Sequence, residues 1–245
     1  MASKLIVLDD GHGLDTPGKA APDGVRENQF NSAKVGFLAT ALKRCGFRVE
    51  LAAPEDKDIS LKTRAQRANS LRADAFISDH YNAFRGNWDE TQGGVETHYY
   101  PGSVEGQKLA ACVQKHIALG TPQINRGIKA SNFAVLRETN MVAILIENGF
   151  MDVRKEAELM LDLEFQKEQA EQTAQGVCEY FGIEYVPEPT SRNALAEAIG
   201  AWVRAGLLNS PEYWLRNAVP GSEVKGEYVS ALIIAGAKKL NEHLP

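Results

Sequence analysis

Three short, unbroken apolar runs constrain the fold of this 245-residue chain more than any other feature. The runs are Leu5–Leu8, Ala75–Ser78 and Val142–Ile146. Such runs are typical of strands that are buried on both faces of a sheet. Parallel strands bring the residues that follow them to one edge of a sheet, where α/β proteins build their sites. His12, His80 and Glu147 follow the three runs, so the sequence predicts a site there, and two imidazoles with a carboxylate indicate a metal site.

Segments with helical spacing separate these runs. Apolar residues recur at intervals of three and four residues in the stretches 28–44, 60–71, 103–119, 152–161 and 164–181. Further strands are expected at 47–51 and 94–100, and a loop from about residue 120 to 132. Strands that alternate with helices in this way predict an α/β fold: a twisted, mostly parallel sheet covered by helices on both faces.

A change of pattern after residue 182 predicts a domain boundary. The segment 183–190 contains Pro187 and Pro189 and has no helical period, so we expect a linker there. Residues 1–182 would form the first domain, and residues 191–245 a small all-α C-terminal domain near the lower size limit for independent folding. Two apolar stripes predict its helices: Ala194, Leu195, Ala198, Ile199, Trp202 and Val203, then Val229, Leu232, Ile233, Ala235, Ala237 and Leu240.

Composition and charge exclude several classes of protein. Hydrophobic residues make up 44% of the chain and charged residues 24%, as in an ordinary globular protein. The formal net charge is −5 with both signs interspersed, unlike the basic face of a nucleic-acid-binding protein. No apolar stretch approaches the ~20 residues that span a bilayer, so no membrane insertion is expected. The run at Leu5 is too short for a signal peptide, so we expect synthesis in the cytoplasm. The sequence assigns no oligomeric state.

Four polar residues carry the predicted site, and each also has a simpler structural explanation. His12 lies between two glycines, where it is either a ligand or an exposed turn residue. His80 is either a ligand or a half-buried histidine bonded to a backbone carbonyl. Glu27 precedes the first helix, where it either interacts with the helix N-terminus or completes a two-histidine, one-glutamate set that recurs in catalytic zinc sites. Glu147 ends an apolar strand, where an unpaired carboxylate costs several kcal/mol and a general base beside a metal is one reason to keep it.

Four short motifs in this order carry a family resemblance. They are Asp9-x-Gly-His-Gly, a Glu that opens the first helix, Ser78-x-His-x-Asn-Ala, and a hydrophobic strand that ends in Glu147-x-Gly-Phe. Together they resemble the zinc-dependent N-acetylmuramoyl-L-alanine amidases of the Amidase_3 type across residues 1 to about 182. The segment 16–31 is similar to one in the amidase domains of phage endolysins. The resemblance implies that His12, Glu27 and His80 bind one zinc ion and that Glu147 is the catalytic carboxylate.

The resemblance also implies a function. We expect a peptidoglycan hydrolase that cleaves the amide between N-acetylmuramic acid and L-alanine of the stem peptide, with zinc-activated water. Without a signal peptide, it would be a phage endolysin that stays in the host cytoplasm until a holin opens the membrane. Residues 191–245 would then bind the cell wall. The alternatives are a host autolysin of the same chemistry, a non-catalytic cell-wall binding protein on an amidase scaffold, and a zinc exopeptidase that acts on free peptides.

The chain departs from the family pattern at three positions near the predicted metal. The family commonly has Pro where Asp10 stands, Gly where Leu14 stands, and an apolar residue where Asp79 stands. Asp10 and Asp79 are expected to add negative charge close to the metal, which would raise its affinity or orient a histidine. Three further residues are expected to line the substrate groove: Asn82, Asn132 and Arg137. His98 lies in an expected strand and matches no ligand position of the family, and a groove role is its minor alternative. His116, on a helix, is expected to be partly exposed.

Overall fold

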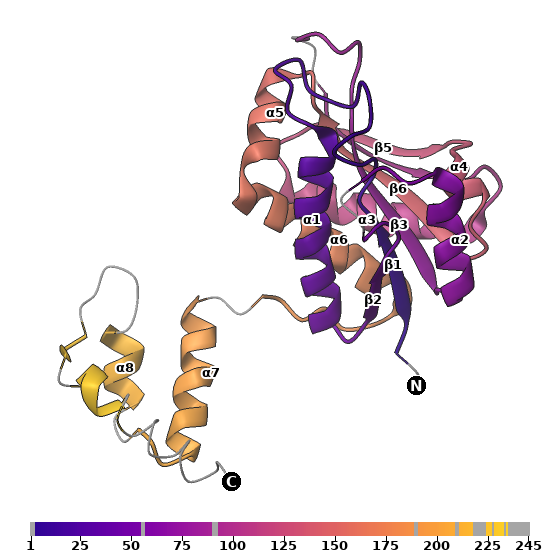
Figure 1. Ribbon diagram of the computed structural model, residues 1–245. Coiled ribbons are helices and arrows are strands. Elements are labelled where there is room, and N and C mark those ends of the chain that lie inside the picture. The colour runs from indigo at the N-terminus through magenta and orange to yellow at the C-terminus, as the bar shows by residue number, and fades with distance from the viewer. Residues whose placement is uncertain are drawn as a thin grey trace. The chain divides into compact units, whose positions relative to one another are not determined.

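The computed structural model describes residues 3–54, 57–89, 93–188, 191–208, 211–217, 224–226, 228–232 and 234 (Figure 1). It confirms the predicted α/β class. The chain divides into two compact units, Met1–Pro187 and Glu188–Pro245. The elements of the first unit are, in chain order, β1 (Leu5–Asp9), α1 (Glu27–Arg44), β2 (Arg48–Leu51), α2 (Leu61–Leu71), β3 (Ala75–Asn82), β4 (Val95–Tyr99), α3 (Val104–Gly120), β5 (Asn125–Ala130), α4 (Ala134–Arg137), β6 (Val142–Phe150), α5 (Arg154–Leu161) and α6 (Leu163–Phe181).

The six strands form one mostly parallel sheet in the order β2-β1-β3-β6-β4-β5. The first four strands in this order are parallel to one another. β4 pairs antiparallel with β6, and β5 is parallel to β4, so β4 and β5 run opposite to the rest. The three strands that the apolar runs predict, β1, β3 and β6, lie side by side in the middle of the sheet. Their carboxyl ends therefore lie at the same edge.

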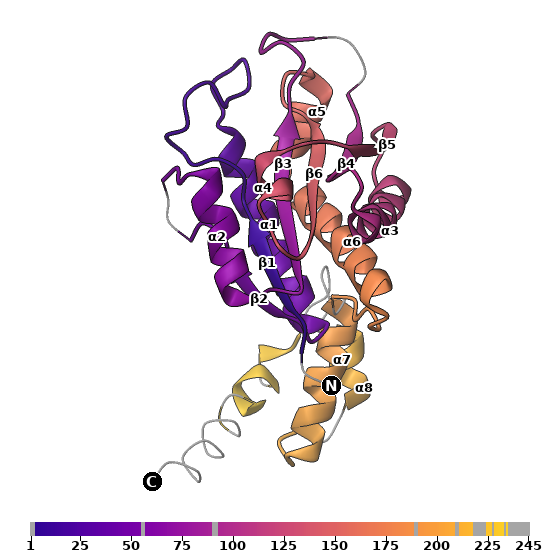
Figure 2. The ribbon, with the colours of Figure 1, turned by 90° about the vertical axis from the view of Figure 1, so that its right-hand side faces the viewer.

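Helices cover both faces of the sheet, as predicted (Figures 1 and 2). On one face, α1, α3 and α6 pack on β1, β3 and β6, with a core that includes Ile6, Leu38, Ile77, Val113 and Ile144. On the other face, α2 and α4 contribute Ala68, Val135 and Leu136 to a smaller core. Its strand residues alternate with those of the first core: Leu5, Val7, Phe76, Ala143 and Leu145. The same alternation of side chains along each strand decides on which face of the sheet the polar residues at the strand ends lie.

Strands β3 and β6 are longer than their apolar runs predict. β3 continues to Asn82 and β6 continues to Phe150, so His80 and Glu147 lie inside strands rather than after them. The register explains the extension, because His80 is paired with Glu147 across the two strands. Polar residues therefore continue the ladder once the apolar core has ended.

The expectation of a loop at 120–132 is wrong over residues 125–130, which form β5. This strand lies at the edge of the sheet, where β4 is its one partner among the described strands. Its sequence, Asn-Arg-Gly-Ile-Lys-Ala, has a single β-branched residue, and Gly127 adopts a φ of 75° at the irregular part of the pairing. Such a strand depends on its neighbour more than on its own propensity, and the hydrophobic pattern carries no sign of it.

In the second unit, the described residues include the helices α7 (Ser191–Arg204) and α8 (Pro211–Asn217). Ile199 and Leu208 are buried, whereas Trp202 is 41% exposed. Tyr213 contacts the rings of Trp214 and Tyr228, so these two contacts are internal packing. Four positions of the second apolar stripe lie outside the described residues, as does Pro189 of the expected linker: Ile233, Ala235, Ala237 and Leu240.

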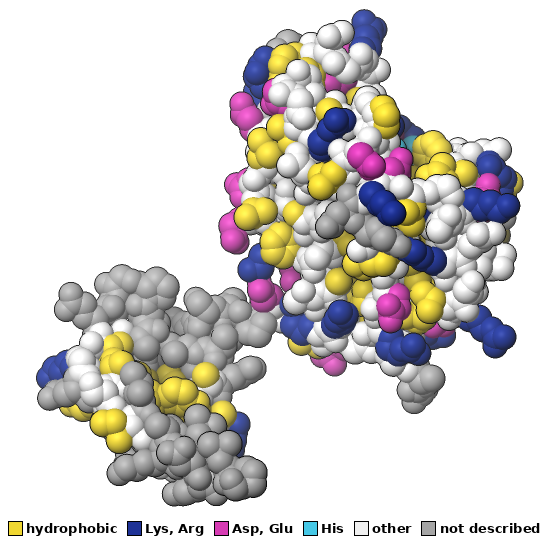
Figure 3. All heavy atoms as spheres, viewed as in Figure 1, with side chains coloured by type: hydrophobic (Ala, Val, Ile, Leu, Met, Phe, Trp, Pro, Cys, Tyr) yellow, Lys and Arg dark blue, Asp and Glu magenta, His cyan; other side chains and the backbone are white. Residues whose placement is uncertain are grey.

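Charged side chains of both signs are interspersed over the face of the molecule drawn in Figure 3. Among the described residues, no helix combines the length and the apolar character that a membrane crossing requires.

Candidate metal centre and active site

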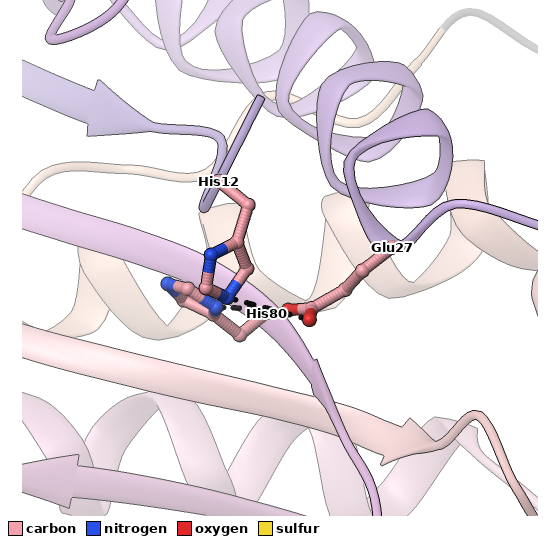
Figure 4. A group of neighbouring side chains, drawn as sticks. All are labelled: His12, Glu27 and His80. Carbon is pink, nitrogen blue, oxygen red and sulfur yellow. Dashed lines mark hydrogen bonds and ion pairs between the residues drawn. The ribbon is translucent and has the colours of Figure 1, made fainter. Parts of the chain in front are cut away.

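His12, Glu27 and His80 come together at the carboxyl edge of the sheet. His12 lies in the loop after β1, Glu27 is the first residue of α1, and His80 lies on β3 (Figure 4). One ligand atom from each of the three residues lies within 4.8 Å of the others. The Glu27 carboxylate contacts both imidazoles, with Oε1 at 2.9 Å from His80 Nδ1 and Oε2 at 3.4 Å from His12 Nε2. The structure therefore brings together the three residues that the sequence analysis singles out as ligands.

The backbone of the loop after β1 packs closely against its neighbours. His12 itself adopts a left-handed conformation, with a φ of 63°, which is uncommon for a residue with a side chain. The flanking glycines serve close approach: the Gly11 backbone lies against the His80 ring, and the Gly13 backbone lies against that of Asp58. The sharp turn expected from glycine freedom is thus made by the histidine, while the glycines remove side chains that would collide.

Arg64, on α2, forms hydrogen bonds with this loop and with the end of β1. Its side chain is buried, and it donates hydrogen bonds of 2.6 Å to Asp9 Oδ1 and to the backbone oxygen of His12. Ser78 also donates to the Asp9 carboxylate, at 2.6 Å. A buried carboxylate and a residue with an unusual φ are therefore both tied to one guanidinium group. The bidentate geometry of arginine suits this role, because its donors are fixed in one plane.

Glu27 is fixed by donors on two elements. Asn31 Nδ2 lies one turn further along α1 and donates to Glu27 Oε1 at 3.3 Å, and the backbone N–H of Tyr81 donates to the same oxygen at 3.2 Å. Asn31 also donates to the carbonyl of Gly11 at 3.0 Å. Its amide therefore links the helix that carries one ligand to the loop that carries another.

The protonation states in the metal-free protein follow from this packing. Burial lowers the pKa of His12 to about 4, against the opposing charge of Glu27. Burial alone would lower the pKa of His80 as well, but its hydrogen bond to Glu27 and the charges of Glu27 and Glu147 raise it to about 9. The pKa of Glu27 is lowered, since the two histidines outweigh the effect of its burial. At neutral pH a proton on His80 thus supplies positive charge next to the Glu27 carboxylate.

Glu147 faces the same space from β6. It is paired with His80 in the parallel ladder, and on its other side with Glu96 of β4. Its Oε2 atom is buried and has no hydrogen-bond partner among the described residues. Burial raises its pKa to about 8, with Glu27 and Glu96 adding to the rise and His80 opposing it. A carboxyl group with a pKa near neutrality can accept and return a proton.

The expectation that Asp79 adds negative charge near the metal is wrong. Its side chain leaves the opposite face of β3 from that of His80, is fully buried, and forms an ion pair with Lys34. Asp10 lies closer to the loop, where Arg64 Nη1 is 3.7 Å from Oδ1 and Asn28 donates to its carbonyl at 2.9 Å. Burial and the charge of Asp9 raise the pKa of Asp10 to about 6. No direct contact between Asp10 and the histidines occurs among the described residues.

A second polar cluster lies on β4 and β5, on the same face of the sheet. Glu96 is buried and accepts hydrogen bonds from Arg126 at 2.6 Å, from Asn82 at 3.2 Å and from Lys129. His98 Nε2 lies 3.1 Å from Glu96, so this histidine is a partner of a buried carboxylate. Two other residues named from the sequence have partners elsewhere. Arg137 donates to Asn132 Oδ1 at 2.6 Å, and His116, which is partly exposed as expected, pairs with Glu179 at 2.6 Å.

Sequence reasoning missed Arg64, Asn31 and Glu96. A weak signal existed for Arg64, because a buried Asp9 at the end of an apolar strand requires a cation, but several arginines could supply it. Asn31 is four residues after Glu27, a spacing that places both on one side of a helix. Glu96 had no signal of its own beyond its place in a strand.

The three candidate ligands fit a divalent metal by their chemistry. Imidazole nitrogen and carboxylate oxygen are ligands that zinc accepts, and three protein ligands leave a position open for reactants. Glu147 is paired with His80 across the neighbouring strands, and its buried Oε2 atom has no hydrogen-bond partner among the described residues.

Comparison with known proteins identifies related chains. The model of the family described as N-acetylmuramoyl-L-alanine amidase matches residues 6–179. The chain is 35% identical over 184 residues to the endolysin of Bacillus phage SPP1, which covers 74% of this chain and 67% of that protein. It is 33% identical over 194 residues to the N-acetylmuramoyl-L-alanine amidase CwlM of Bacillus licheniformis, which covers 78% of this chain and 71% of CwlM. The crystal structure of an N-acetylmuramoyl-L-alanine amidase from Clostridium difficile 630 superposes with a TM-score of 0.70 at 34% identity, over 74% of this chain and 98% of that one.

Proposed function

The chain belongs to the N-acetylmuramoyl-L-alanine amidase family, and we propose that it works with a zinc ion held by His12, Glu27 and His80 and with Glu147 as the catalytic carboxylate. The family activity is hydrolysis of the amide that joins N-acetylmuramic acid to L-alanine in peptidoglycan. The single observation that carries the proposal is the convergence of the three ligand atoms within 4.8 Å, with Glu147 next to His80 in the ladder.

Each side chain has a defined task in this proposal. When bound, zinc supplies Lewis acidity toward the carbonyl oxygen of the scissile amide and toward the attacking water. Glu147 accepts a proton from that water at its buried, unpartnered Oε2 atom and returns it to the leaving nitrogen. The carboxyl group suits both steps because burial sets its pKa near neutrality, and a neighbouring cation favours its charged form. Asn31 and the Tyr81 N–H hold Glu27 in place throughout.

The experiment compares wild type with Glu147→Gln on a defined muropeptide, with zinc present and after chelation. Removing a general base costs about 10²–10⁴-fold in rate. We therefore expect Glu147→Gln to bind one zinc ion as wild type does but to release product at least 100-fold more slowly. Mass spectrometry of the products identifies the cleaved bond, which distinguishes the amidase from an exopeptidase. Unchanged release by Glu147→Gln would refute the role of this residue, and full activity without metal would refute the zinc.

We also propose that the protein is a phage endolysin that reaches the wall from the host cytoplasm. The 35% identity to the SPP1 endolysin supports this origin, while the similar identity to CwlM keeps a host autolysin as the alternative. Expression in the cytoplasm of a susceptible host with and without a co-expressed holin tests the proposal. Lysis only with the holin supports it, and secretion of the protein without a holin would contradict it.

The second unit, Glu188–Pro245, is proposed to hold the enzyme on the cell wall. Trp202 supports this role, because the residue is 41% exposed and its ring has a large apolar face that can contact a sugar. Co-sedimentation with purified walls tests it in a Glu147→Gln background, which prevents digestion. We expect the full chain to sediment and residues 1–187 to remain in solution. Equal sedimentation of both proteins would contradict the role.

A further inference from the structure

Three buried polar side chains lie behind the metal centre, on the face of the sheet that α1 covers. They are Lys34 of α1, Asp79 of β3 and Asn148 of β6, and each is 0% exposed. Lys34 Nζ lies 2.5 Å from Asp79 Oδ1 and 2.5 Å from Asn148 Oδ1, and Asn148 Nδ2 donates to the same Asp79 oxygen at 3.0 Å. The three groups thus form a closed triangle of hydrogen bonds.

Each member of this triangle is close in sequence to a residue of the proposed site. Asp79 directly precedes His80, and Asn148 directly follows Glu147. Lys34 lies two helical turns after Glu27 on the same side of α1. The triangle therefore joins the three elements that carry Glu27, His80 and Glu147. Because neighbouring residues in a strand point to opposite faces, the triangle holds these strands without entering the reaction space.

The ladder between β3 and β6 is irregular at this point. Regular pairing ends at His80 with Glu147 and resumes at Asn82 with Phe150. Within this gap, Asn148 Nδ2 donates to the backbone oxygen of His80 at 3.1 Å, and Gln169 of α6 donates to the backbone oxygen of Asn148 at 3.3 Å. Hydrogen bonds from the side chains of Asn148 and Gln169 thus replace backbone bonds between β3 and β6 beside His80, a proposed zinc ligand.

Stability alone does not account for a lysine and an aspartate at these positions. A buried ion pair loses hydration energy, and apolar replacements of similar volume often match or exceed its stability. In this chain the charge of Asp79 comes together with a buried cation and with the amide that reaches His80.

We propose that Lys34, Asp79 and Asn148 are positioning residues, which fix the backbone of β3 and β6 so that His80 and Glu147 keep their spacing about the metal. This inference rests on the proposed function. It predicts that the triangle sets metal affinity and the rate of the chemical step, while substrate binding and overall stability depend on it little.

The test replaces the triangle in two steps. Lys34→Met with Asp79→Leu removes both charges and leaves the hydrogen bond from Asn148 to His80; adding Asn148→Val removes this bond as well. Ile117→Val, in the core under α3, serves as the control for a small packing change away from the site. Four properties of each variant are measured. They are thermal unfolding, zinc affinity by chelator competition, the visible spectrum of the Co²⁺-substituted protein, and kcat and KM on a muropeptide.

We expect the triple variant to unfold within a few degrees of wild type. Its zinc affinity should fall at least about 10-fold, as for other residues that orient metal ligands. The Co²⁺ spectrum should change and kcat should fall with KM unaltered, whereas the control keeps all four values. A triple variant with wild-type zinc affinity and Co²⁺ spectrum would overturn the inference. If that variant does not fold, Asn148→Val alone decides by the same criteria. A wild type without zinc binding would instead refute the proposed function, and this inference with it.

Discussion

The backbone of Gly11 lies against the imidazole ring of His80, so closely that a Cβ atom at Gly11 would meet Cε1 of the ring at 2.3 Å. Real Cβ atoms do not approach other atoms to this distance. The glycine in the loop after β1 is therefore required by a side chain of β3. The conformation of the loop that carries His12 therefore depends on the position of the His80 ring.

Gly11→Ala should displace the His80 ring and weaken zinc binding, with amidase activity falling in parallel. Gly36→Ala is the matched control, because Gly36 is an exposed helix residue with no atom within 4 Å of the added methyl group. The control should keep its activity and gain about 0.4–1 kcal/mol of stability. Zinc titration measures the metal affinity of both variants, and urea unfolding measures their stability. Wild-type zinc affinity in Gly11→Ala would contradict the prediction.

Arg64→Met should lower the free energy of unfolding by about 3–5 kcal/mol, because it leaves the Asp9 carboxylate buried without its cation. The bond to the carbonyl of His12 is lost as well, which frees the residue with the unusual φ. Arg64→Lys keeps the charge but cannot donate to both groups in one plane, so an intermediate loss is expected. Urea unfolding measures both variants, and a loss below 1 kcal/mol in Arg64→Met would show that Asp9 is otherwise satisfied.

Zinc binding should release a proton and strengthen as pH rises. Below its pKa of about 9, His80 of the metal-free protein carries a proton, and a ligand nitrogen must be free of it. Between about pH 6 and 8 the apparent affinity should therefore rise about tenfold per pH unit from this group alone. Isothermal titration in buffers with different ionisation enthalpies counts the released protons. The same binding constant across this range would contradict the assigned protonation state.

The Glu96 cluster should make stability sensitive to acid. Hydrogen bonds from His98, Lys129 and Arg126 outweigh burial and lower the pKa of Glu96 from 4.5 to about 2. Since the folded-state pKa is lower, the stabilisation is complete above about pH 4.5 and is lost as pH falls toward 2. The loss amounts to no more than about 3 kcal/mol. Chemical unfolding across this range measures it, and Glu96→Gln should flatten the profile. An equal slope in wild type and variant would assign the acid sensitivity to other groups.

Much of the fold follows from local patterns. The buried runs at β1, β3 and β6 and the helical spacing of α1 and α6 depend on neighbouring residues only, so both the elements and the α/β class can be predicted from them. β5 could not be predicted, because an edge strand of low β propensity is stabilised by its partner. The ends of β3 and β6 were also missed, since their polar residues continue the ladder only by pairing with each other.

By itself, the sequence determined which residue types stand at the ends of the central strands, and with them the candidates His12, Glu27, His80 and Glu147. Only the tertiary structure decided what surrounds them. Lys34 meets Asp79 across 45 residues and Asn148 across 114, and Arg64 meets Asp9 across 55. A hydrophobic period reports which face of an element is buried. The partner of a buried charge depends on strand register and helix packing, which no local pattern contains.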